Sequence, residues 1–154
     1  MTRIITPSRR MSAVEVVERL IGMRLLALAT ATADGRPIVG PVDGIFYRGC
    51  FHFGSAPDSV RFRHIDRRPQ VSATHVPGEE LAVTVQGRAV PIDVGAAEHA
   101  DFRDAVLGIY VPRYGEDWES FLDSGVRYAR IEPAKMFTFR LDASAADPDR
   151  ADGG

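Results

Sequence analysis

The sequence predicts a mainly β fold of the α+β class, an antiparallel barrel of at least six strands with peripheral helices. Short apolar or alternating runs recur along the chain and are joined by tight-turn signals, of which Asp34-Gly35, Arg48-Gly49 and Pro77-Gly78 are the clearest. Helical patterns occur only near the chain ends and between hairpins, an arrangement typical of such a barrel. With no internal repeat or linker, residues 11–141 are expected to form one domain, followed by a disordered tail at 142–154.

The first expected element is an amphipathic helix over Ser12–Ile21, preceded by a flexible arm at residues 1–10. Ser12 followed by Glu15 is a capping-box pattern, and Gly22 is a suitable stop. The apolar stripe expected to face the core comprises Val16, Val17, Leu20 and Ile21.

Two hairpins are expected to follow this helix. The small apolar run Arg24–Thr32 is typical of a buried strand, and Arg36–Asp43 is expected to return beside it. Pro37 and Pro41 indicate edge positions or a bulge, because proline lacks the amide that a sheet ladder needs. Ile45–Phe53 continues as the second hairpin.

An arginine-rich helix and a further hairpin come next. The helix begins near Ser59 and stops at Pro69. Gln70–His75 is expected to be a strand that turns back into the long alternating run Leu81–Val90. Gly87 is a candidate β-bulge within that run.

The last third of the chain is expected to contain two helices and two strand-like runs. Ala96–Leu107 has helical periodicity, Ile109–Gly115 is expected to be a loop, and Asp117–Leu122 is expected to be a short helix. Val126–Leu141 contains two strand-like runs that we expect to be broken at Glu132-Pro133.

Composition and charge exclude several classes of protein. The formal net charge of −2 gives no general attraction to nucleic acid or to a membrane surface. No apolar run approaches the roughly 20 residues of a membrane span, and the first ten residues lack the apolar stretch of a signal peptide. Cys50 is the only cysteine, which excludes an intrachain disulfide and a cysteine-based metal cluster. We therefore expect a cytoplasmic protein without a metal site, a nucleic-acid partner or a membrane anchor.

The stretch Gly44–Ala73 contains the strongest candidate site. A turn of small residues, Gly54–Asp58, leads from a strand into a helix that begins near Ser59 and Arg61. Amides at a helix N-terminus and an arginine guanidinium suit a phosphate group. The alternative is a solvated helix face, on which arginines are common. Asp58 would either compete with a bound anion or cap the helix.

No residue is identified as a nucleophile, a general acid or a general base. The sequence has no Rossmann glycine fingerprint, Walker A loop, serine elbow or histidine–glutamate metal motif. If the protein is an enzyme, a bound cofactor would therefore perform the chemistry. Tyr114 and Trp118 flank a loop, where they either pack as core or lid residues or stack on a ligand.

Three stretches share the order of elements of a known family. In FHFGSAPDSVRFRHIDRRPQVSA a strand, a hydroxyl-bearing turn, a Ser-x-Arg helix start, a polar pair, a proline and another strand follow one another. LALATATADGRPIVGPV and LAVTVQGRAV supply a hairpin and a later glycine-containing strand. From Leu25 to Leu141 the chain thereby resembles the pyridoxamine 5′-phosphate oxidase-like split-barrel family, whose members bind flavin mononucleotide (FMN) or the deazaflavin F420.

The resemblance implies a six-stranded split barrel, a homodimer with the cofactor between its subunits, and a cofactor site with four parts. These are phosphate contacts, a platform for the isoalloxazine ring, a polar contact from a later strand, and a wall from the partner subunit. The implied phosphate contacts are Ser55, Ser59 and Arg61, and the implied ring platform is Pro41, Val42 and Asp43. Gln86 would supply the polar contact, and Trp118 would be the wall from the partner subunit.

The resemblance also implies an oxidoreductase that transfers hydride between the cofactor and a small organic substrate. We expect FMN because the anion site is compact; F420 is the alternative, since its acidic tail could use Arg63, Arg67 and Arg68. The Arg-x-His substrate motif of authentic pyridoxamine-phosphate oxidases is absent from Val126–Leu141, so vitamin B6 phosphates are not expected as substrates. A non-catalytic flavin- or deazaflavin-binding protein is the remaining alternative.

Overall fold

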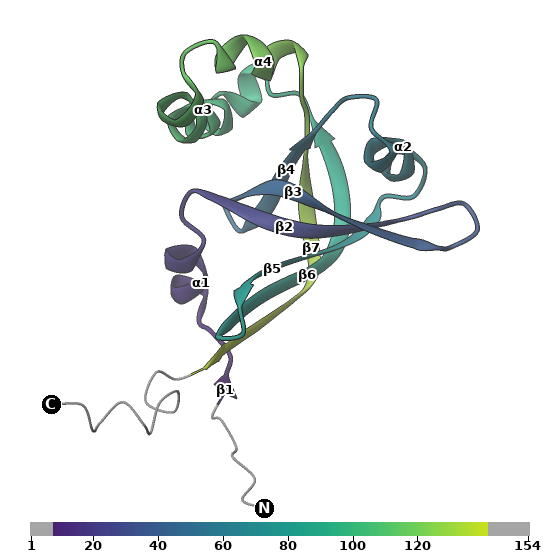
Figure 1. Ribbon diagram of the computed structural model, residues 1–154, viewed down its shortest axis with the longest axis vertical. Coiled ribbons are helices and arrows are strands. Elements are labelled where there is room, and N and C mark those ends of the chain that lie inside the picture. The colour runs from purple at the N-terminus through teal and green to yellow at the C-terminus, as the bar shows by residue number, and fades with distance from the viewer. Residues whose placement is uncertain (1–7, 142–154) are drawn as a thin grey trace, which may run out of the picture.

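Seven strands and four α-helices make up residues 8–141, the part of the chain that the computed structural model describes (Figure 1). The strands are β1 (Ser8–Arg9), β2 (Met23–Ala31), β3 (Pro37–Tyr47), β4 (Cys50–Ser55), β5 (Gln70–Gly78), β6 (Leu81–Ile92) and β7 (Arg127–Leu141). The helices are α1 (Ala13–Arg19), α2 (Val60–Arg67), α3 (Ala100–Tyr114) and α4 (Trp118–Ser124), and a 3₁₀ turn, Ala97–His99, precedes α3. The expected tail and residues 1–7 of the expected arm lie outside the described residues.

Six strands close into the expected antiparallel barrel. Their order is β7-β4-β3-β2-β5-β6, and pairing between β6 and β7 completes the ring. The short β1 pairs with the end of β7 as an extra strand. Helices α3 and α4 lie over one end of the barrel, while α1 and α2 lie on different sides of it (Figure 1). The fold class predicted from the sequence is confirmed.

The turn signals produce the expected hairpins. Arg48 and Gly49 both have positive φ, 47° and 82°, which a two-residue β3–β4 turn requires. Strand β2 was expected to be buried, but only one of its faces is covered. Leu26 and Leu28 point into the barrel, whereas Leu25 is exposed on the outside. Alternation of this kind is the normal pattern of a barrel strand.

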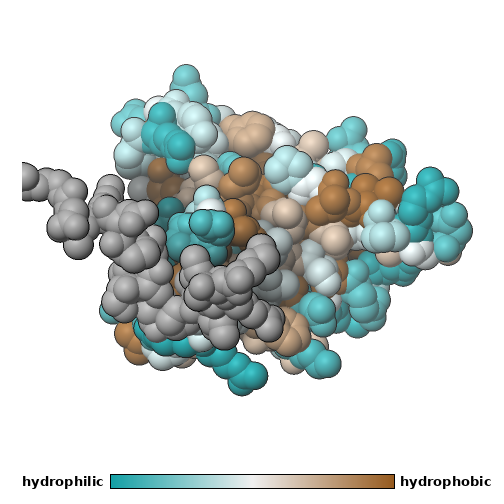
Figure 2. All heavy atoms as spheres, turned by 60° about the horizontal axis from the view of Figure 1, so that its bottom comes forward, coloured by the Kyte–Doolittle hydropathy of each residue, from teal (hydrophilic) through white to brown (hydrophobic). Residues whose placement is uncertain are grey.

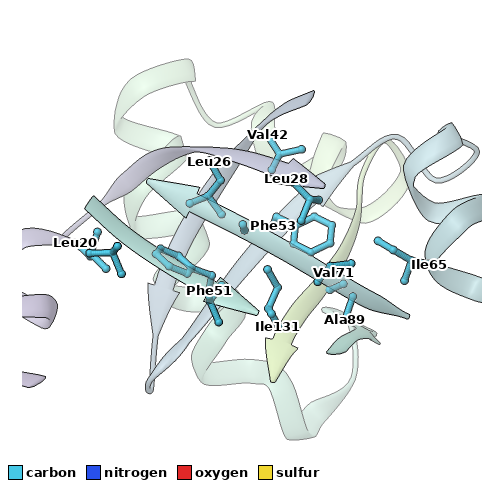
Figure 3. Packing of buried hydrophobic residues seen from close by; sticks show 14 of the residues in the cluster. Leu20, Leu26, Leu28, Val42, Phe51, Phe53, Ile65, Val71, Ala89 and Ile131 are labelled. Carbon is cyan, nitrogen blue, oxygen red and sulfur yellow. The ribbon is translucent and has the colours of Figure 1, made fainter. Parts of the chain in front are cut away.

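The barrel interior is filled by apolar side chains from every barrel strand and from two helices. Phe51 and Phe53 of β4 are completely buried, and Leu26, Leu28 and Ile131 surround them (Figure 3). Helix α2 closes one opening with Phe62 and Ile65, and α1 contributes Val16 and Leu20. The predicted α1 stripe is half correct, since Val17 and Ile21 are exposed. Its capping box between Ser12 and Glu15 is present as expected.

Strand β7 is continuous where two runs were expected. The local signal at Glu132-Pro133 is a register shift against β6, opposite Gly87, and not the end of a strand. A Cβ atom on Gly87 would collide with the carbonyl of Glu132. A register shift is thus present next to Gly87, as expected, but the extra residue is Ala134 of β7, and the strand continues through Pro133.

Helix α3 continues through Tyr114, so the loop expected at Ile109–Gly115 is wrong. Phe102, Val106 and Tyr110 form one buried stripe at four-residue spacing, and their packing extends the helix beyond the expected end. Pro112 lies close enough to the C-terminus to cost a single helical hydrogen bond. This extra turn places Tyr110 and Tyr114 over the barrel end.

The outer face of the barrel carries two rows of mostly uncharged residues. Strand register places them side by side across β3, β2, β5, β6 and β7. One row is Pro41, Ala27, Thr74, Thr84 and Phe137, and the other is Val39, Ala29, Ser72, Gln86 and Lys135. Lys135 is the one charged residue in these rows. Figure 2 shows hydrophobic residues gathered beside the hydrophilic tip of the β2–β3 hairpin, at the right of the view.

Within residues 8–141, none of the helices combines the length and hydrophobicity needed to cross a membrane.

Candidate functional site

Helix α2 begins at the junction that the sequence singled out. Ser59, and not Asp58, is its N-cap, and its hydroxyl oxygen accepts a hydrogen bond from the Phe62 amide at 3.3 Å. Asp58 is exposed in the preceding turn. The amides of Val60 and Arg61 belong to the first helical turn and have no intrahelical acceptor. They remain for water or an anion.

The guanidinium of Arg61 joins three elements. Its Nη1 donates to the hydroxyl oxygen of Ser55 at the end of β4, at 2.9 Å. Its Nη2 donates to the backbone carbonyl of Pro41 on β3, at 3.3 Å. Four residues predicted for the site, Pro41, Ser55, Ser59 and Arg61, are therefore brought together by β3, β4 and α2.

The charge of Arg61 has no carboxylate partner among the described residues. Burial lowers the pKa of its guanidinium, because a charged group loses solvation when it is partly enclosed. A half-buried cation of this kind gains from a bound anion, which would restore the lost stabilisation. Arg61 is therefore partly enclosed and does not lie on a fully solvated helix face. Arg63 and Arg67 on the same helix remain exposed.

A cavity of about 150 Å³ lies beside Arg61. It is lined by Leu28, Thr30, Ile38, Val39, Gly40, Ser59, Val60 and Arg61. Gly40 has a specific role here, since a Cβ atom at this position would lie 3.0 Å from Nη2 of Arg61. Because Gly40 has no side chain, the guanidinium of Arg61 has room at this position. The hydroxyl oxygen of Thr30 is hydrogen-bonded to Nδ1 of His64, at 2.9 Å.

A larger cavity of about 460 Å³ opens between the barrel end and helices α3 and α4. Its lining consists of Asp43, Gly54, Ser55, Ala56, Tyr110, Tyr114, Trp118, Phe121, Val126 and Tyr128. We call it the aromatic cavity. Burial raises the pKa of both Tyr110 and Tyr128, so these phenols stay protonated at neutral pH. The Tyr110 hydroxyl donates to Oδ2 of Asp43 at 3.2 Å.

Trp118 forms part of the wall of this cavity within its own chain. Its ring stacks on Tyr110 with centroids 4.4 Å apart and planes 7° from parallel. Tyr110 also stacks on Tyr114, at 6.0 Å. Phe121 meets Trp118 at a tilt, at 5.9 Å. These aromatic residues have both roles considered from the sequence, because the same rings stack on one another and line the cavity.

Ser55 connects the two cavities. It lines the aromatic cavity, and it accepts the hydrogen bond from Arg61, which lines the smaller cavity. The corner around Arg61 and the aromatic cavity are therefore neighbours. Such a pair of subsites suits a ligand with one phosphate end and one flat ring, or a phosphate-bearing cofactor beside an aromatic substrate.

Comparison with protein-family models identifies the family of this chain. The family model described as pyridoxamine 5′-phosphate oxidase matches residues 13–138. The chain belongs to the pyridoxamine 5′-phosphate oxidase family. Among curated proteins, none matches the chain in sequence.

Solved structures with the split-barrel fold of this family agree. A conserved hypothetical protein from Mycobacterium tuberculosis has a TM-score of 0.70 at 20% identity, covering 94% of this chain and 93% of that one. A FAD-binding protein from Mesorhizobium loti gives 0.65 at 22% identity, covering 89% and 98%. The heme storage protein HutZ from Vibrio cholerae also gives 0.65, at 18% identity, covering 84% and 95%. At these identities the likeness concerns the fold.

Two of the residues that the family resemblance suggested, Val42 and Gln86, do not place a side chain at the corner around Arg61. The side chain of Val42 is buried in the barrel core, so only its backbone can face a ligand. Gln86 is exposed on β6, in the same row as Val39 on β3 and three strands away. Three strand spacings amount to about 14 Å. Gln86 therefore does not contact the corner around Arg61 in its own chain.

The sequence did not identify Gly40, Thr30, Tyr110 or Tyr128 as site residues of this family member. Tyr110 continues the four-residue stripe of Phe102 and Val106, but the helix predicted from the sequence ended at Leu107, before Tyr110. The other residues gave no local signal, because each reaches its cavity through strand register or helix docking. In the described part of the chain, no group of three or more His, Cys, Asp or Glu side chains could hold a metal ion.

Proposed function

We propose that the protein binds FMN and works as an oxidoreductase on a small organic substrate. The observation that carries this proposal is the half-buried, unpaired guanidinium of Arg61, held by Ser55 and Pro41 at the start of α2. Membership of the family and the fold shared with a FAD-binding protein from Mesorhizobium loti support a flavin as the ligand.

The residues present fit the phosphate of this cofactor. Arg61 would supply a positive charge, and the hydroxyls of Ser59 and Ser55 would supply hydrogen bonds. The backbone amides of Val60 and Arg61 would direct their partial positive charge towards the same phosphate. When bound, FMN supplies hydride transfer, which no side chain can perform. The protein would hold the ring against the Pro41–Asp43 segment and exclude water from it.

F420 is the second candidate cofactor. Arg63 and Arg67 are exposed on the same helix as Arg61 and could meet a long acidic tail. Arg68 is less suited than expected, because its Nε donates to the carbonyl of Ala31 at 2.8 Å. We favour FMN since the cavity beside Arg61 is small, about 150 Å³.

We also propose that the protein is a homodimer that pairs through the outer rows of the barrel. Five strands present mostly uncharged residues there, half of them apolar, with Lys135 the one charge in the two rows. An exposed uncharged surface of this extent is typical of an interface. Pro41, whose carbonyl binds Arg61, lies in one of these rows. A partner on this face would bring its own Gln86 towards the cofactor.

Pyridoxamine phosphate and pyridoxine phosphate are not the proposed substrates, since the Arg-x-His motif is absent from β7. A non-catalytic carrier or sensor is the rival function. It is favoured by the absence of an assigned general acid or base and by the fold shared with a heme storage protein from Vibrio cholerae. Turnover with a panel of reductants and acceptors separates the two functions.

Titration of the cofactor-free protein with FMN, riboflavin, F420 and FAD tests the cofactor. Riboflavin has the same ring as FMN and lacks its phosphate. We expect FMN to bind at least about tenfold more tightly than riboflavin, the value of one charge-assisted contact. Equal binding of FMN and riboflavin would rule out the phosphate site, and tighter binding of F420 would favour the alternative cofactor.

A further inference from the structure

We propose that the aromatic cavity binds the substrate and selects flat aromatic molecules that carry a cationic or uncharged hydrogen-bond donor, and that it rejects anions. The identity of this ligand as the substrate rests on the proposed function. Its chemical class rests on the cavity alone, which is formed by one chain and does not depend on a cofactor.

The walls of the cavity select for a flat ring. Five of its lining residues are aromatic: Tyr110, Tyr114, Trp118, Phe121 and Tyr128. Its volume of about 460 Å³ lies within the range of small-molecule sites. Trp118 and Tyr110 are already nearly parallel, at 7°. A planar ligand can therefore contact ring faces and edges without rearranging the wall.

The polar end of the cavity selects for a donor. Asp43 is the one carboxylate in the lining, and among the described residues that line the cavity none is lysine, arginine or histidine. Tyr110 donates to Oδ2 of Asp43, and its raised pKa keeps the phenol neutral. Asp43 is exposed and retains further lone pairs for an incoming N–H or O–H group. An anionic substrate would face this carboxylate without a compensating charge.

The nearest cation on β4 and α2 does not reverse this selection. Arg61 lines the smaller cavity and not the aromatic cavity, and two of its five N–H groups already donate to Ser55 and to Pro41. A cofactor phosphate at the start of α2 would neutralise it further. Because Ser55 lines the aromatic cavity and also binds Arg61, the substrate would lie beside the cofactor.

The test uses three probes of one shape, 2-naphthylmethylamine, 2-naphthylmethanol and 2-naphthoate, which are cationic, neutral and anionic. Calorimetry measures their affinities for the FMN-free and the FMN-loaded protein. Trp118 is the only tryptophan, so quenching of its fluorescence reports binding in this cavity. The variants are Asp43→Asn, which keeps an oxygen for Tyr110, and Asp104→Asn, an exposed carboxylate on α3 outside the cavity lining.

We expect the wild type to bind the amine about tenfold more tightly than the carboxylate, with the alcohol between them. Asp43→Asn should reduce this ratio severalfold, and Asp104→Asn should leave it unchanged. The proposal is overturned if the carboxylate binds as tightly as the amine, if Asp43→Asn keeps the ratio, or if Trp118 fluorescence does not respond.

The outcomes also separate this inference from the proposed function. If FMN does not bind more tightly than riboflavin but the probe preference is present, the cofactor assignment fails and the ligand class stands. If FMN binds as expected and the probes show no preference, the ligand class fails and the cofactor assignment stands.

Discussion

Arg61 and Ser55 are joined by a 2.9 Å hydrogen bond from Nη1 to the hydroxyl oxygen, and this contact connects the start of α2 to the wall of the aromatic cavity. They are six positions apart in the chain, with a turn of small residues between. The two proposed subsites therefore share a wall, so a change on one side should be measurable on the other.

Replacing Arg61 by alanine should weaken FMN binding about ten- to a hundredfold, since a charge-assisted contact contributes about 1.5–3 kcal/mol. Riboflavin binding should be unchanged because riboflavin has no phosphate. The free energy of unfolding should change little, since the half-buried charge has no carboxylate partner among the described residues. Gly40→Ala should act in the same direction by crowding Nη2.

The control for Arg61→Ala is Arg63→Ala, on an exposed position of the same helix. It should leave FMN binding within about twofold of the wild type and weaken F420 binding if F420 is the natural ligand. Unchanged binding of both cofactors by Arg61→Ala would show that the arginines form only a solvated face.

Replacing Gly87 by alanine should lower the free energy of unfolding by about 2 kcal/mol or more. The added Cβ collides with the backbone carbonyl of Glu132, which cannot move aside without breaking the β6–β7 register. Gly108→Ala on α3 is the matched control. No atom lies within 4 Å of its added Cβ, so it should be neutral or slightly stabilising. Denaturant titration of both variants measures the difference, and equal stability would contradict the bulge.

Light scattering at micromolar concentration should give the mass of a dimer. Ala27→Arg should produce a monomer, because Ala27 lies exposed between Pro41 and Thr74 in an outer row. It should also weaken FMN binding if the partner completes the site. Ala33→Arg in the exposed β2–β3 turn is the control and should remain dimeric. A wild-type monomer would exclude the proposed interface.

The protein should lose stability as the pH falls from 6.5 to 4. Burial lowers the pKa of His52 from 6.5 to about 4, so the folded state disfavours the protonated ring that the unfolded state accepts. The contribution is complete above pH 6.5 and is lost as the pH falls through the folded-state pKa. It amounts to about 1.4 kcal/mol for each unit of difference in pKa.

His52→Asn should remove most of the pH dependence of the unfolding free energy in this window. His99→Asn is the control, because His99 is the smallest of the causes that act on the His52 pKa. Chemical denaturation at several pH values gives the slopes. If His52→Asn keeps the wild-type slope, another group is responsible.

Features with a local cause could be predicted from the sequence. The turn at Arg48-Gly49, the capping box at Ser12 and the step from Ser55 to Arg61 each depend on neighbouring residues, and each is present. The Asp43–Tyr110 contact could not be predicted, because it joins residues 67 apart through the docking of α3. The same docking extends α3 past the expected loop.

Which face of a strand is buried also could not be predicted from local sequence. Alternation in β2 depends on which side the barrel closes, and a run of small apolar residues does not encode that choice. Gln86 has a clear place in β6, yet its distance from Arg61 follows from the pairing of four strands.

Strand β7 pairs with β1, β4 and β6, which has a consequence for the order of events during protein synthesis. Until residues 127–141 leave the ribosome, β4 and β6 both have an unpaired edge, and the barrel cannot close. The ion pair between Arg140 and Glu15 spans 125 residues and forms among the last contacts. The barrel therefore closes only after β7 has been synthesised, and we expect long-range pairs of this kind to slow folding. Ribosome stalling before β7 would expose two open sheet edges to other nascent chains.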